Sequence, residues 1–177
     1  MMSDPQFTRP NTVSRPELLQ DGSDYQFRQM IYDMDHLAHL IQDTRRNISQ
    51  TLDLSPPEFN ALMGVALLQG DLGVTVGDLA KHLRVAGPFA TQQANLLSKR
   101  GLLVKKPNPA DKRSTLLALS DEGRALFQEL APRLQRLNDR IFASLSREDF
   151  VFFCDLLQRV TAGWTQTNLI MEAEELI

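Results

Sequence analysis

The chain has 177 residues, of which 42% are hydrophobic and 23% are charged, a composition typical of a globular domain rather than a disordered chain. It contains no continuous apolar run of the ~18 residues that a membrane span requires, and no apolar core of a signal peptide at the N-terminus. Cys154 is the only cysteine, which excludes an intrachain disulfide. These features predict a cytoplasmic protein.

Charge is distributed unevenly along the chain. The net charge is −3, yet residues 79–113 contain eight lysines and arginines and a single acid, Asp111. The C-terminal residues 146–177 are acidic instead. A basic segment within an acidic protein is typical of a module that meets phosphate on one side, although a solvated charged loop is the alternative.

The first half of the chain predicts a mobile arm followed by two helices. Residues 1–24 are rich in Pro, Ser, Asn and Asp, which favours a mobile arm. Apolar residues then recur at spacings of three and four over residues 25–52, as in a long amphipathic helix. Ser55 and Glu58 form the pattern of a capping box, which begins a second helix that ends near Gly70.

The middle of the chain predicts two further helices separated by a turn. Residues 74–76 suggest a short strand, and residues 76–83 a short helix. After a turn at residues 84–86, Pro88 opens a helix that ends at Gly101, a suitable left-handed cap.

A hairpin and two long helices follow. Residues 102–106 and 115–119 read as strands around a turn-rich segment, residues 107–112. Long helices are predicted from about 120 to 145 and from 146 onwards. The order of elements is that of a winged helix-turn-helix. We therefore expect a mainly α fold with a small β-hairpin wing, in which a winged helix-turn-helix lobe is joined to long helices.

The helix that Pro88 opens has the pattern of a DNA-recognition helix. Ala90, Ala94 and Leu97 share one face and are expected to pack inward. The opposite face presents amide, hydroxyl and aromatic side chains, which suit contacts with base edges, thymine methyl groups and phosphates. The outward residues Phe89 and Leu96 leave open a protein-binding surface as the alternative.

The hairpin tip carries a cation that suits the minor groove of DNA. An arginine on a thin wing, here Arg113, is attracted by the negative potential of that groove. Asp111 is badly placed against phosphate, and we expect it to pair with the Arg113 guanidinium and orient it.

Residues 101–114, with Leu119 to Gly123, resemble the wing signature of the MarR family of bacterial regulators, because Gly-Leu, Asp-x-Arg and Ser-x-x-Gly elements occur in order. The resemblance implies a homodimer that reads a pseudo-palindromic operator with half-sites ~34–36 Å apart. The chain departs from the family, which often has basic residues where Gln92 and Leu96 stand. The predicted DNA-contacting residues are Pro88, Phe89, Thr91, Gln92, Gln93, Lys99, Lys105, Asp111, Lys112, Arg113 and Ser114.

The resemblance also implies a domain organisation and an effector site. Residues 25–54 and 120–177 would form the dimerisation region, and residues 55–119 the winged lobe. Many family members release DNA when a small, often aromatic anion binds between the two, and we expect a repressor released by such an acid or its thioester. The predicted pocket residues are Arg28, Tyr32, His36, His39, Met63 and Leu67; a solvent-exposed or interface role for the histidines is the alternative.

Other activities find little support in the residues. Three histidines and one cysteine are a thin inventory for a metal site, and no phosphate loop, dinucleotide fingerprint or nucleophile motif occurs. We therefore expect no enzyme activity, no metal and no cofactor. The remaining alternative is a winged-helix module that contacts protein rather than DNA.

Overall fold

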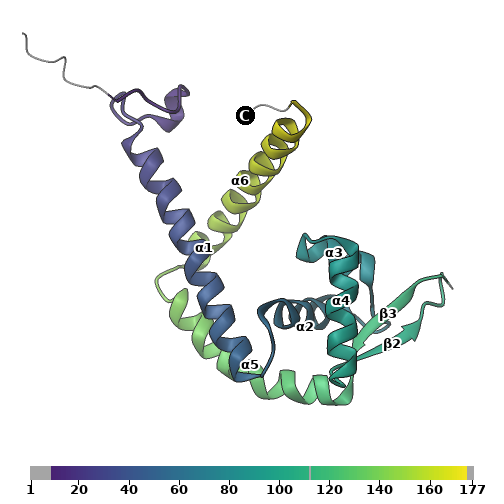
Figure 1. Ribbon diagram of the computed structural model, residues 1–177. Coiled ribbons are helices and arrows are strands. Elements are labelled where there is room, and N and C mark those ends of the chain that lie inside the picture. Colours follow the sequence, from purple (N-terminus) through teal and green to yellow (C-terminus); the bar gives the residue numbers. More distant parts are fainter. Residues whose placement is uncertain (1–8, 112, 175–177) are drawn as a thin grey trace, which may run out of the picture. The chain divides into compact units, whose positions relative to one another are not determined.

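The computed structural model describes residues 9–111 and 113–174. It divides into two compact units, one that ends at Gly123 and one that begins at Arg124, and each is described by itself. The elements (Figure 1) are η1 (Pro16–Leu18), α1 (Tyr25–Thr51), α2 (Pro56–Leu68), β1 (Val74–Thr75), α3 (Val76–Leu83), α4 (Gly87–Lys99), β2 (Leu103–Pro107), β3 (Thr115–Leu119), α5 (Asp121–Ile141) and α6 (Arg147–Glu174).

Helices α2, α3 and α4 surround the core of the winged lobe, as the sequence predicts. Leu62, Leu79 and Leu97, one from each helix, are among its largest fully buried side chains. Gly64 lets α2 and α3 approach closely, since a Cβ at this position would lie 2.8 Å from Leu79 Cδ1. The buried residues lie at helical spacing, which is why the pattern was readable in the sequence.

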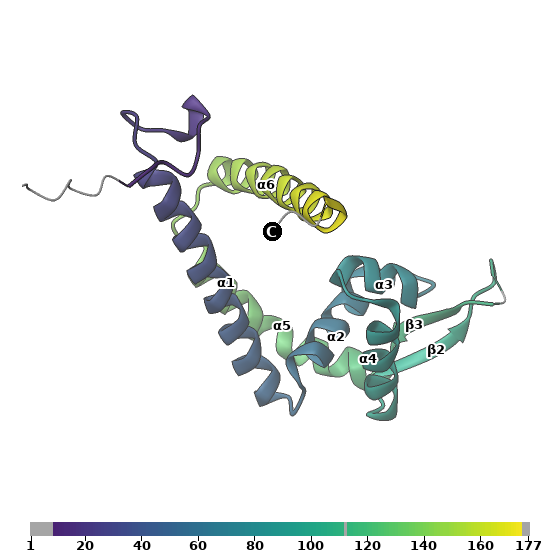
Figure 2. The same ribbon diagram turned by 45° about the horizontal axis from the view of Figure 1, so that its top comes forward.

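Three antiparallel strands complete the lobe in the order β1-β3-β2. The central strand β3 is buried from Leu116 to Leu119, and its bounds agree with the prediction. Strand β2 continues to Pro107, one residue beyond its predicted end. Because β2 is an edge strand, the missing N–H of a proline is tolerated there. The β2–β3 hairpin extends beyond α3 and α4 of the same unit in both views (Figure 1, Figure 2).

Side-chain caps fix where the helices begin. Ser55 accepts a hydrogen bond from the Glu58 N–H (3.4 Å), and Glu58 accepts one from the Ser55 N–H (2.9 Å), which confirms the predicted capping box of α2. Thr75 Oγ1 accepts the Asp78 N–H (3.0 Å) in the same way for α3. Such caps stabilise a helix end by about 1 kcal/mol.

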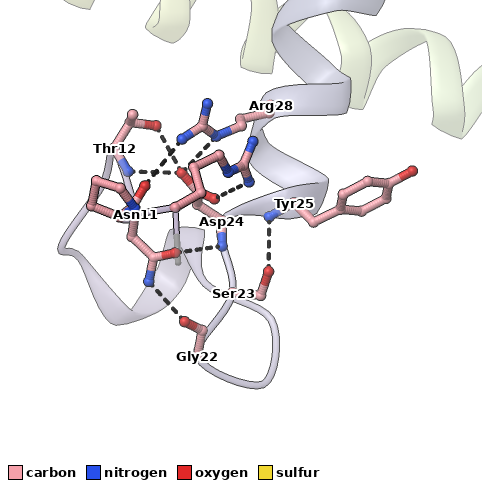
Figure 3. Close-up of polar contacts among 9 residues, drawn as sticks. Asn11, Thr12, Gly22, Ser23, Asp24, Tyr25 and Arg28 are labelled. Carbon is pink, nitrogen blue, oxygen red and sulfur yellow. Dashed lines mark hydrogen bonds and ion pairs between the residues drawn. The ribbon is translucent and has the colours of Figure 1, made fainter. Parts of the chain in front are cut away.

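Residues 9–24 fold back on the first turn of α1 around one buried carboxylate, which Figure 3 shows. The Asp24 carboxylate accepts hydrogen bonds from the Thr12 N–H (2.7 Å) and Arg28 Nε (2.9 Å), and Arg9 Nη2 lies 3.0 Å away. The Thr12 N–H, then the Thr12 hydroxyl and Arg28, lower the pKa of Asp24 to about 2. The sequence predicted a mobile arm; its described part, from residue 9, is instead held by these bonds.

The second unit consists of α6 and the part of α5 from Arg124 onwards. Helix α5 ends at Ile141, four residues before the predicted end. Ser146 Oγ accepts the Asp149 N–H (3.1 Å), and Asp149 accepts the Ser146 N–H (3.0 Å), so a second capping box begins α6. Many large apolar residues of α6 are exposed, including Phe153, Leu157 and Trp164. No described helix is long and apolar enough to cross a bilayer.

Candidate nucleic-acid interface

Helix α4 has one buried face and one exposed face, and most predicted contact residues lie on the exposed one. Ala90, Ala94 and Leu97 are buried against the lobe, as predicted. Around them the helix exposes the predicted contact residues Pro88, Phe89, Thr91, Gln92 and Lys99, together with Asn95 and Leu96. The exposed face therefore combines amide donors and acceptors with two apolar side chains.

The prediction that Gln93 points outward is wrong. Its exposed fraction is 5%, so it belongs to the buried face. Gln93 lies three residues after Ala90 and four before Leu97, and helical residues at these spacings share a side. The predicted inward face included the residues four and seven positions after Ala90 but not Gln93, which lies three positions after it.

No side chain caps the first turn of α4. Its N-cap, Ala86, offers no side-chain acceptor, and Pro88 occupies the first turn without an N–H. The Thr91 hydroxyl donates to the Gly87 carbonyl (2.9 Å), which fixes the hydroxyl and leaves its oxygen free to accept. The remaining N–H groups of this turn form the positive end of the helix dipole.

The wing tip is braced by its own polar side chains. Asn108 Nδ2 donates to Ser114 Oγ (2.7 Å), and Ser114 N–H and Oγ donate to the Asp111 carbonyl (3.0 and 3.1 Å). Ser114, a predicted DNA contact, thus also holds the tip together. The tip is a set of local turns rather than a loose loop. Lys112 lies outside the described residues.

Asp111 does not form the predicted pair with the Arg113 side chain. Its carboxylate accepts the Arg113 backbone N–H (2.9 Å), a local bond that an Asx side chain readily makes two residues ahead. Among the described residues, the exposed Arg113 guanidinium has no ion-pair partner. Asp111 therefore shapes the backbone and leaves the cation free.

A side-chain bridge joins the wing to the helix. Lys105 Nζ on β2 donates to Asn95 Oδ1 on the exposed face of α4. Neighbouring Lys106 is also exposed. The sequence predicted Lys105 as a DNA contact but not Asn95, since no spacing along one element relates a helix residue to a strand residue.

A second junction fixes the base of the wing. Ser120 Oγ donates to the Gly101 carbonyl and accepts the Gly123 N–H (2.9 Å), while the Ser120 N–H donates to the Leu102 carbonyl (3.1 Å). One serine thus joins the end of α4, the start of β2 and the first turn of α5. The Ser-x-x-Gly pattern signalled this cap in the sequence.

Arg100, at the end of α4, is engaged elsewhere. Its Nη2 lies 2.8 Å from Asp53 Oδ2 in the turn between α1 and α2. The exposed lysines Lys99, Lys105 and Lys106 and the exposed Arg113 carry the positive charge of this surface instead.

The predicted effector residues are spread over α1 and α2. Arg28 is committed to Asp24 and to the Pro10 carbonyl (3.2 Å). His39 Nδ1 contacts the Asp35 carbonyl on its own helix (2.9 Å). Tyr32, His36 and Leu67 are exposed, and Met63 is half-buried. Within the described ranges, no three His, Cys, Asp or Glu residues lie close enough to hold a metal ion.

Comparisons with known proteins include a match to this same lobe. The MarR family sequence model matches residues 52–114. The uncharacterized HTH-type transcriptional regulator YsmB of Bacillus subtilis is 28% identical over 118 residues, which are 67% of this chain and 79% of YsmB.

Two solved structures share the fold. The PcaV regulator of Streptomyces coelicolor, in complex with its natural ligand, is 26% identical with a TM-score of 0.56, over 72% of this chain and 91% of PcaV. The S. aureus MepR–DNA complex is 18% identical with a TM-score of 0.65, over 76% of this chain and 97% of MepR. Sequence motifs, the order of elements and these matches agree that residues 52–114 form a winged lobe of the MarR family.

Proposed function

We propose that this chain is a sequence-specific DNA-binding transcription regulator, and that it acts as a homodimer. One observation carries the proposal: the exposed face of α4 and the cationic wing belong to one compact unit and are joined by the Asn95–Lys105 hydrogen bond. A helix and a cationic hairpin held together in this way suit adjacent grooves of a duplex.

The residue types suit α4 to the major groove of DNA and the wing to the minor groove. Gln92 on α4 has the bidentate geometry that recognises adenine in the major groove, and Phe89 suits a thymine methyl group. Arg113, which lacks an ion-pair partner among the described residues, suits the narrow minor groove of an A·T-rich flank. Lys99 and Lys106 would contact phosphates, which position the lobe without reading sequence.

The homodimer is supported by apolar residues on the long helices. On α6, Phe150, Phe153, Leu157, Val160 and Trp164 recur at alternating spacings of three and four, and each is between 39% and 54% exposed. On α1, Met30, Leu37 and Ile41 share the same kind of spacing and are also exposed. This spacing is that of helices that pack against partner helices. Residues 25–54 and 120–177 would thus form the dimerisation region.

We further propose that a small organic acid or its thioester regulates DNA binding, with repression relieved when the ligand binds. The likeness to PcaV, whose structure contains its natural ligand, supports an effector. Of the predicted pocket residues, Tyr32, His36 and Met63 remain the best candidates, since Arg28 is occupied by Asp24. A thermal-shift screen with aromatic acids tests this, because a ligand of the folded state raises Tm by mass action.

Salt-dependent DNA binding tests the main proposal. Fluorescence anisotropy with a duplex of the region upstream of the chain's own gene should show affinity that falls steeply with salt, by about 0.9 decade per decade of salt for each phosphate contacted. A scrambled duplex of equal length should bind more weakly. Equal, salt-independent affinity for both duplexes would contradict the proposal.

The alternative is a protein-interaction module, favoured by the exposed Phe89 and Leu96 on α4. Replacement of both by serine separates the two functions. A DNA-binding lobe would keep its salt dependence in this variant and lose part of its sequence preference. A protein-contact module would show no duplex binding in either form.

A further inference from the structure

The turn between α3 and α4 carries an arginine where glycine is the usual residue. Arg84 has φ 55° and ψ 47°, in the left-handed region. Its N–H donates to the Lys81 carbonyl (3.2 Å), and the Val85 N–H donates to the Ala80 carbonyl (3.1 Å). This pair of bonds is a Schellman motif, with Arg84 at the position that glycine most often occupies. A side chain there is unfavourable, because its Cβ crowds the backbone.

Among the described residues, no hydrogen bond or ion pair of the Arg84 side chain compensates for this unfavourable conformation. The Arg84 side chain is exposed and, among the described residues, makes no hydrogen bond or ion pair. By contrast, Lys81 on the preceding helix α3 pairs with Asp78 at 3.6 Å. Folding alone therefore gives no reason for an arginine rather than a glycine at residue 84.

The location of Arg84 provides a reason. It lies two residues before Ala86, the N-cap of α4, and so beside the first turn of the exposed face. A helix that presents its N-terminal residues to the major groove has the phosphates of the groove wall next to that turn. An arginine guanidinium binds phosphate in bidentate geometry.

We propose that Arg84 is a further DNA-contacting residue, which binds a backbone phosphate beside the N-terminal end of α4. The inference rests on the proposed DNA-binding function. It adds a contact at the opposite end of α4 from Lys99. In the sequence, Arg84 is marked only as one cation of the basic segment, residues 79–113.

The test compares Arg84→Gly and Arg84→Lys with the wild-type chain. Arg84→Gly removes the cation and relieves the backbone, so Tm should stay equal or rise by up to ~3 °C. The salt slope of duplex binding should fall by ~0.9 for each protomer, and so by ~1.8 for the proposed dimer, which corresponds to a loss of roughly 60-fold in affinity near 0.1 M salt. Because phosphate carries no sequence information, operator and scrambled duplexes should lose affinity equally. Arg84→Lys keeps the cation and should restore the salt slope, with part of the affinity still lost because an ammonium cannot make the bidentate contact.

Two control variants separate the causes. Asp21→Gly relieves the same kind of left-handed conformation (φ 50°) outside the interface and should not weaken binding. Arg45→Gln removes an exposed cation from α1 and should leave the salt slope unchanged.

The outcomes are distinct. An Arg84→Gly variant with wild-type affinity and salt slope overturns the inference. So does a loss of binding that accompanies a lower Tm and that lysine does not restore, since this would indicate a structural role. A wild-type chain that binds no duplex refutes the proposed function itself.

Discussion

The most specific structural prediction concerns Gly123, where the wing meets α5. A Cβ at this buried position would overlap the Leu102 carbonyl oxygen and lie 3.1 Å from its carbonyl carbon. The overlapping atoms belong to the backbone, which cannot rotate away as a flexible side chain can. Gly123→Ala must therefore shift the whole backbone segment at the start of β2. The displaced oxygen is also the acceptor of the Ser120 N–H. The shift that relieves the overlap therefore also weakens the Ser120–Leu102 hydrogen bond, and both changes disturb the segment that positions the wing.

The magnitude follows from those two effects. Overpacking a close-packed site costs about 1–3 kcal/mol, and the loss of a hydrogen bond about 1 kcal/mol. We therefore expect Gly123→Ala to lower the free energy of unfolding by about 2–4 kcal/mol, and Tm by roughly 5–15 °C. Urea denaturation followed by circular dichroism measures the first quantity, and calorimetry the second.

A matched glycine provides the control. Gly77, on α3, has only Thr75 Oγ1 near its added Cβ, at an ordinary 3.7 Å. Gly77→Ala should be neutral or stabilise the fold by about 0.5–1 kcal/mol. A Gly123→Ala variant within about 0.5 kcal/mol of wild type would refute the packing described for this junction.

Three further predictions concern other parts of the chain. Asp24 has a pKa of about 2, below its ordinary value of 3.8, so its carboxylate stabilises the fold at neutral pH and this contribution disappears as pH falls through about 2. Asp24→Asn should lower Tm at neutral pH, with a difference from wild type that shrinks below about pH 4 in calorimetry; a constant difference would count against the cluster. Gln92→Ala should remove about 1–3 kcal/mol of discrimination between operator and mutated sites with little change in Tm, whereas the buried Gln93→Ala should lower Tm; the reverse pattern in anisotropy and melting would contradict the assigned faces. Phe153→Glu should dissociate the proposed dimer in light scattering, whereas Phe152→Glu, off the apolar stripe, should not; two equal effects would disprove that stripe as the interface.

Local patterns in the sequence were sufficient to predict the helices and strands of most of the winged lobe. Helix α3 and strand β3 have their predicted bounds, because caps and apolar spacing are encoded by residues close together in the chain. The Ser55–Glu58 capping box is of the same kind. Helix α5 gives way to turns at residues 142–144, so its predicted end, near residue 145, was too late.

The features that sequence reasoning missed depend on contacts between distant residues. Asn95 meets Lys105 only after the wing has folded beside α4, and no periodicity marks that pair. Asp24 holds residues 9–24 through partners that lie up to 15 residues away, so composition alone suggested a mobile arm. The expected pair of Asp111 with the Arg113 guanidinium was wrong. The Asp111 carboxylate can accept a hydrogen bond either from the side chain or from the backbone N–H of Arg113, and the sequence does not distinguish these two donors.

Footprinting on an operator duplex tests most directly whether α4 and the wing grip adjacent grooves. Dimethyl sulfate reports guanine N7 in the major groove, and hydroxyl radicals report the minor-groove backbone. We predict major-groove protection flanked by minor-groove protection, with only the latter lost in Arg113→Ala. Protection confined to one groove in the wild-type chain, or a minor-groove footprint unchanged in Arg113→Ala, would contradict the account.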